Sequence, residues 1–145
     1  MQGVVSSMSF PRRKMREIVF RMIFSENVTR GCSARELASV CRDESGVTRK
    51  VLRQAYERMR NVYDHMATID GHIQNASTAY AFERISNVEK NVLRLAVYEL
   101  LFDTSVPPQV VMAEAIRLSR KFGTPEGGEF VNAVIDTIYK SMDSP

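Results

Sequence analysis

Residues 88–101 read "VEKNVLRLAVYELL", and this stretch decides how the chain is expected to fold. At 100° per residue its apolar side chains surround the helix on nearly all sides, whereas a surface helix shows a single apolar stripe. A helix of this kind belongs in the middle of a helical bundle. Ser86, with Glu89 three residues later, has the spacing of a capping box, so we expect the central helix to begin there.

Glu99 is the unusual residue of this central helix. A carboxylate among apolar neighbours needs a cationic or hydrogen-bonding partner, because an unpaired buried charge is costly. Arg16 and Arg94 are the candidate partners. We therefore expect a structural role for Glu99.

Helical periodicity continues on both sides of this stretch, and no segment shows the alternation of a half-buried strand. Gly123 has the place of a helix C-cap, and Thr124 with Pro125 opens the last helix. The remaining expected helical segments are 11–26, 33–41, a long stretch over 48–74, a short turn over 79–85, and 109–122.

These patterns predict an all-α protein of about seven helices. A chain of 145 residues can bury a substantial core, and we expect two small helical bundles packed together as one compact domain. The polar stretch "NAST" marks the boundary between an N-terminal subdomain, 10–75, with an arginine-rich first helix and a C-terminal subdomain, 76–145. Residues 1–9 are expected to form a flexible tail.

The composition is typical of a globular protein, with 44% apolar and 26% charged residues. No apolar run approaches the ~18 residues that span a bilayer, and the first ten residues lack the basic and apolar regions of a secretory signal. Two cysteines, Cys32 and Cys41, indicate reduced thiols and not a disulfide framework. The sequence therefore predicts a cytoplasmic protein.

Few residues suggest catalysis or metal binding. His65 and His72 lie two helical turns apart with no recognisable set of further ligands, so surface histidines are the simpler interpretation. No cysteine pair has zinc spacing and no glycine-rich loop has Walker or dinucleotide-binding form. We expect no catalytic residue, no metal and no cofactor, and hence not an enzyme.

The first helix carries an unusual charge cluster. Arg12, Arg13, Lys14 and Arg16 crowd its first turns, and residues 1–16 contain no acid. The helix dipole favours anions at this end, so stability does not explain the cations. A nucleic acid would explain the cations, because the cluster could neutralise several of its phosphates. The alternative is an ordinary solvated helix face. All four charges are expected to be exposed, since burying an unpaired charge is costly.

The same helix also carries apolar residues on two sides. Phe20 and Phe24 lie roughly opposite the main apolar stripe, and we expect both sides to be buried. The main stripe is formed by Met15, Ile18, Val19, Met22 and Ile23.

Three segments together resemble the NusB transcription antitermination factors of bacteria. They are "RRKMREIVFRMIF", "FERISNVEKNVLRLAVYELL" and "VPPQVVMAEAIRLSRKFGTPEGGEFVNAVID". They cover about half of the chain in the order and spacing of the family. The chain departs from the common pattern at Arg21, Phe24 and Tyr80, where glutamine, tyrosine and tryptophan are frequent in the family.

The resemblance implies a non-catalytic protein that binds boxA-type single-stranded RNA together with NusE, a small-subunit ribosomal protein. That complex acts on RNA polymerase to support antitermination, notably of ribosomal RNA operons. By position, Glu83 and Glu89 would contact the protein partner, although solvated charge is the simpler interpretation of both. The positions implied to contact or lie near RNA are Arg12, Arg13, Lys14, Arg16, Arg21, Arg94 and Phe130.

Three alternatives stay open at this point. Some family members associate through their RNA face, which would give a homodimer. A purely structural helical adaptor would bind protein and not RNA. A related domain also precedes some ribosomal RNA cytosine methyltransferases, but this chain ends at Pro145 without a cofactor-binding half, so a free-standing methyltransferase is not expected.

Overall fold

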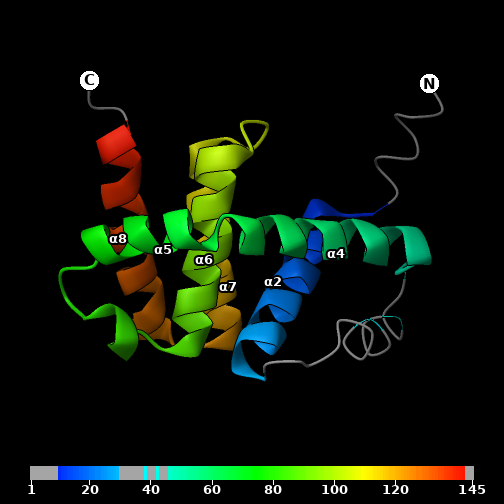
Figure 1. The fold of residues 1–145 in the computed structure, drawn as a ribbon, viewed down its shortest axis with the longest axis horizontal. Coiled ribbons are helices and arrows are strands. Elements are labelled where there is room, and N and C mark those ends of the chain that lie inside the picture. The colour runs from blue at the N-terminus through cyan, green and yellow to red at the C-terminus, as the bar shows by residue number, and fades with distance from the viewer. Residues whose placement is uncertain (1–9, 30–37, 39–41, 43–45, 143–145) are drawn as a thin grey trace. The chain divides into compact units, whose positions relative to one another are not determined.

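The computed structural model describes residues 10–29, 38, 42 and 46–142, and the secondary structure of these residues is entirely helical (Figure 1). This confirms the all-α prediction, and the six α-helices of the described residues come near the expected seven. The tail 1–9 and almost all of the helix expected over 33–41 lie outside the described residues. The elements are α2 (Arg12–Val28), α4 (Arg49–Asp64), α5 (Met66–Ala76), the 3-10 turn η1 (Phe82–Arg84), α6 (Asn87–Phe102), α7 (Pro108–Phe122) and α8 (Pro125–Met142).

The chain divides into two compact units, residues 1–61 and 62–145. This division lies within α4, and α5 belongs to the second unit because it packs on α6 and α8. The subdomain boundary expected between residues 75 and 76 stays a prediction.

The second unit is built around α6. Every residue from Asn91 to Leu100 is buried, and α6 contacts α5, α7 and α8. In Figure 1, α6 and α7 run antiparallel and α5 crosses α6 at a steep angle. Glu99 is only 4% exposed. The prediction of a central helix with an enclosed carboxylate is therefore confirmed.

The long helix expected over 48–74 is interrupted at His65, so that expectation was wrong. The backbone of His65 leaves the helical region, with φ −110° and ψ 16°, and its N–H donates to the Val62 carbonyl at 3.1 Å. The imidazole ring packs on Phe102, with ring centroids 4.1 Å apart, and on Tyr98 at 6.2 Å. A contact between distant segments thus accompanies the break.

Local capping determines where several helices begin. The Ser86 hydroxyl accepts a hydrogen bond from the Glu89 N–H at 3.2 Å, as predicted for the capping box. Thr124 accepts from the Gly127 N–H at 3.2 Å at the start of α8, and Thr48 from the Val51 N–H at 3.2 Å at the start of α4. Gly123 follows the end of α7, as expected.

The first unit contains α2 and most of α4. On α2 the expected core stripe is buried apart from Met15, which is half-buried, and Phe20 is buried as well. Phe24 is half-buried and its ring lies 5.9 Å from that of Phe20. None of the helices in the described parts of the chain is long and apolar enough to cross a membrane.

Candidate nucleic-acid and protein interfaces

The N-terminus of α2 presents three exposed cations, Arg12, Arg13 and Lys14. The first turn contains no acid, and Pro11 at the N-cap position supplies no side-chain hydrogen bond. Positive side chains therefore stand where free backbone N–H groups already attract anions. This combination suits an anionic ligand such as a phosphate.

Arg16 does not share this exposure. It is 8% exposed, so the expectation that all four cations of the cluster are exposed was wrong for Arg16. Arg21 is half-buried. The exposed part of the cluster is therefore Arg12, Arg13 and Lys14.

Arg94 is held inside the second unit. Its Nε and Nη2 donate to the two carboxylate oxygens of Asp70, each at 2.9 Å, and its Nη1 donates to Asn91 Oδ1 at 3.1 Å. The residue is 7% exposed. The guanidinium thus pairs with Asp70 and not with Glu99, and a place for Arg94 at or near the RNA stays a prediction.

Arg94 also lies close to the turn that carries Glu83. Its Cζ is 5.7 Å from the ring centroid of Phe82, and Lys90 Nζ is 4.5 Å from the same ring. Two cations over one ring favour a fixed position for η1. Glu83 and Arg84, the other two residues of η1, are exposed.

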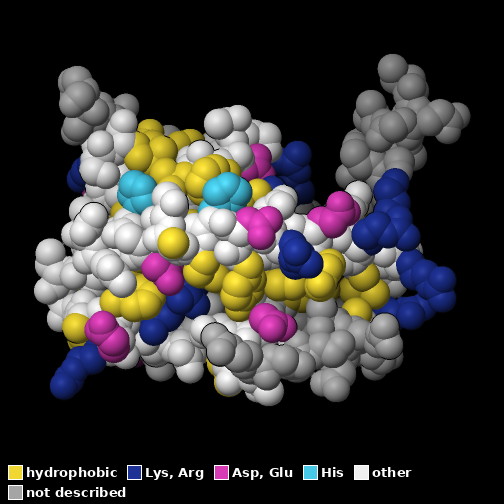
Figure 2. All heavy atoms as spheres, viewed as in Figure 1, with side chains coloured by type: hydrophobic (Ala, Val, Ile, Leu, Met, Phe, Trp, Pro, Cys, Tyr) yellow, Lys and Arg dark blue, Asp and Glu magenta, His cyan; other side chains and the backbone are white. Residues whose placement is uncertain are grey.

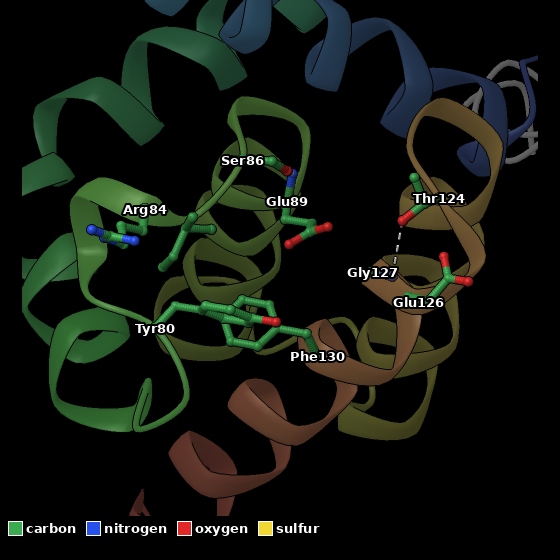
Figure 3. A pocket seen from close by; sticks show the side chains of 9 residues that line it. Tyr80, Arg84, Ser86, Glu89, Thr124, Glu126, Gly127 and Phe130 are labelled. Atoms are coloured by element: carbon green, nitrogen blue, oxygen red, sulfur yellow. Dashed lines mark hydrogen bonds between the residues drawn. The ribbon is translucent and has the colours of Figure 1, made fainter.

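A pocket of about 250 Å³ opens beside η1 in the second unit (Figure 3). The rings of Tyr80 and Phe130 meet edge to face on one side, with centroids 5.2 Å apart and planes at 74°. The lining residues are Tyr80, Arg84, Ile85, Ser86, Glu89, Thr124, Glu126, Gly127 and Phe130. Phe130 and Glu89, for which the family resemblance implies different partners, therefore line one pocket.

Close packing fixes one wall of this pocket. A Cβ at Gly127 would lie 2.5 Å from Glu89 Oε2 and 3.0 Å from Ser119 Oγ. Only a glycine leaves the Glu89 carboxylate room to lie against the start of α8. Ser119 Oγ is buried and has no hydrogen-bond partner in the structure.

The charges in the pocket are two carboxylates, Glu89 and Glu126, and one guanidinium, Arg84. Glu89 stands in the first turn of α6 and Glu126 in the first turn of α8. Figure 3 shows Glu89 between the two, with Arg84 on the side away from Glu126. The excess negative charge favours a cationic group of a partner over a phosphate.

The histidines do not form a metal site with other described residues. Across residues 10–29, 38, 42 and 46–142, no group of three His, Cys, Asp or Glu side chains could hold a metal ion. His65 stacks on aromatic rings, as described above, and His72 is half-buried. Cys32 and Cys41 lie outside the described residues.

One feature of α4 was missed from the sequence. Arg49, Lys50 and Arg53 are exposed on the first two turns of this helix, which has no acid in its first turn. A signal was present, because no acid occurs between Ser45 and Glu57 while three cations do. Figure 2 shows Lys and Arg side chains gathered over this end of α4.

Exposed cations at two helix N-termini suit an anionic ligand, and a small acidic pocket suits a cationic group of a partner. The sequence matches the NusB family over residues 13–140. A transcription antitermination protein NusB of an Anaeromyxobacter species is 37% identical over 135 residues, which cover 93% of this chain and 94% of the relative. The chain belongs to the NusB family.

Solved structures agree with this membership. A Thermotoga maritima NusB structure has 33% sequence identity and a TM-score of 0.77, covering 92% of this chain and 93% of the other. A crystal structure of the antitermination factors NusB and NusE in complex with double-stranded RNA has 28% identity and a TM-score of 0.75, covering 90% and 96%.

Proposed function

We propose that this protein is a cytoplasmic, non-catalytic antitermination factor. It binds boxA-type single-stranded RNA together with the ribosomal protein NusE. It then joins the antitermination complex on RNA polymerase, notably at ribosomal RNA operons. Membership of the NusB family supports this proposal, as does a similar protein seen in a complex with NusE and RNA.

The observation that carries the RNA part is the exposure of Arg12, Arg13 and Lys14 at an N-terminus without any acid. Three neutralised phosphates would give a slope of about −2 for log affinity against log salt on single strands. A slope near zero between 50 and 200 mM salt would remove the electrostatic basis of the proposal.

Glu83 and Glu89 are the proposed contacts to NusE. Both belong to the second unit: η1 presents Glu83, and Glu89 lines the pocket. Phe130 lines the same pocket, so we infer that its ring marks the border at which RNA and protein partner meet. Glu89 and Phe130 can then contact different partners although they line the same pocket.

Charge reversals at the two surfaces test the proposal. Arg12→Glu with Arg13→Glu should weaken binding of a boxA-type RNA by about 100-fold at low salt, because attraction is replaced by repulsion. It should leave NusE binding intact. Glu89→Lys should weaken NusE binding and preserve RNA binding. Fluorescence anisotropy with labelled RNA and calorimetry with NusE measure the two separately.

Two results would contradict the proposal. Equal damage to both interactions by both variants would refute separate surfaces. Tight NusE binding by the parent protein without any RNA binding, alone or in the complex, would favour the helical adaptor instead.

A further inference from the structure

Four residues of α4 form a stripe along one face of the helix: Arg49, Arg53, Tyr56 and Arg60. The spacing i, i+4, i+7, i+11 places them within about 60° of one another around the axis, over a length of about 16 Å. All four are exposed, and Tyr56 is 39% exposed. The buried residues Val51, Leu52, Ala55 and Met59 lie on a separate face of the helix.

Helix stability does not account for the cations at the start of this stripe. Arg49 and Lys50 occupy the first turn of α4, which contains no acid, although the dipole favours negative charge there. A ligand with both anionic and aromatic groups would interact with the arginines and with the tyrosine of the stripe.

Single-stranded RNA has these two properties. Arginines neutralise its phosphates, and an exposed aromatic ring provides a surface on which an unpaired base stacks. A membrane surface fits less well, because a helix lying on lipid needs an exposed apolar face, and the apolar face of α4 is buried. An acidic protein would match the charge, but it offers no unpaired base on which the ring of Tyr56 can stack.

We propose that Arg49, Arg53, Tyr56 and Arg60 form a second RNA-binding surface. It takes nucleotides that flank the segment held by Arg12, Arg13 and Lys14, so the protein covers more RNA than the boxA element alone. The identity of the ligand depends on the proposed function, because both surfaces would bind the same RNA strand. The stripe itself rests only on the geometry of α4.

Extended RNAs test this surface. The probes are a 12-nucleotide boxA-type RNA and the same RNA with ten uridines added at either end. The parent protein should bind at least one extended RNA more tightly than the short RNA. Arg49→Gln with Arg53→Gln should abolish that gain, roughly tenfold, and make the salt slope on the extended RNA shallower by about 1.4. Affinity for the short RNA should not change.

Two controls make the result specific. Arg120→Gln with Lys121→Gln removes the same charge from exposed positions of α7 and should retain the gain. At the ring, Tyr56→Phe should retain the gain and Tyr56→Leu should lose most of it, because only an aromatic face stacks on a base. Urea melts of each variant check that the fold is intact.

Several outcomes would overturn the proposal. These are a parent protein that gains nothing from either extension, an equal loss in the α7 control, or a stripe variant that loses only binding to anionic lipid vesicles. If the parent does not bind the short RNA, the proposed function fails. In that case a 20-nucleotide oligouridine, tested on the same variants, still decides whether the stripe binds RNA.

Discussion

The first turns of α6 and α8 differ in charge from those of α2 and α4. In the second unit, α6 and α8 each have a hydroxyl cap and an acid in the first turn, Ser86 with Glu89 and Thr124 with Glu126. In the first unit, α2 and α4 have no acid in the first turn and carry exposed cations there.

The difference separates residues that stabilise the fold from residues that serve a ligand. An acid at a helix N-terminus stabilises the helix, whereas a cation there costs stability. The first unit therefore gives up stability at the surfaces where a phosphate would compensate. In the second unit, α6 and α8 have acids in their first turns, and both acids line a pocket.

The largest expected effect concerns the interior of the second unit. Arg94→Met should lower the free energy of unfolding by about 3 kcal/mol, because it leaves the Asp70 carboxylate and Asn91 without their partner. Urea denaturation measures this loss. The double variant with Asp70→Leu should recover part of it. An unchanged midpoint combined with lost RNA affinity would support a place for Arg94 at the RNA.

A smaller effect is expected at the cap of α6. Ser86→Ala should cost about 1 kcal/mol, since the Glu89 N–H loses its acceptor. Ser86→Asp should restore most of it, because aspartate is also a good cap. Thermal melts of the two variants provide the comparison, and equal melting temperatures for parent and alanine variant would show that this cap does not stabilise α6.

At the first turn of α2, substitution is expected to raise the stability of the protein and not to lower it. Arg12→Glu should raise the free energy of unfolding by about 0.5 kcal/mol, because an acid complements the dipole, while RNA binding is weakened. The gain should shrink in 1 M salt, where surface charges are screened. A loss of stability would mean that the cations stabilise the fold, and the contrast between the units would not hold.

The smallest stability effect is predicted at Gly127. Alanine favours a helix over glycine by up to about 1 kcal/mol, and the atoms its Cβ would meet include the movable end of Glu89. We expect Gly127→Ala to melt near the parent temperature but to weaken NusE binding several-fold by displacing the carboxylate. Gly128→Ala, whose Cβ would meet Arg120 and Ile116, is the matched control and should bind NusE normally.

The sequence predicted those parts of the fold that depend on near neighbours. The Ser86 cap, the end of α7 at Gly123 and the start of α8 follow from residues within one turn. The break at His65 does not, because its ring packs on Phe102, which is distant in the sequence.

Prediction of the candidate site from the sequence was limited in the same way, because contacts between distant residues decide its geometry. Exposure of Arg12, Arg13 and Lys14 follows from their charge, but the same reasoning failed for Arg16, which is buried. Nothing local to Arg94 indicates that Asp70 holds its guanidinium. That Glu89 and Phe130 line one pocket depends on how α6 and α8 pack, which residue spacing does not determine.

The enclosure of α6 has a consequence for amide hydrogen exchange. Amides in a segment that is buried on all sides exchange only when the whole unit opens, so those from Asn91 to Leu100 should report its global unfolding free energy. The first turn of α2 has no side-chain cap and should exchange rapidly. Comparing the protection of Ile18 to Ile23 with that of α6, residue by residue, then measures whether the two units unfold as one cooperative structure or as two.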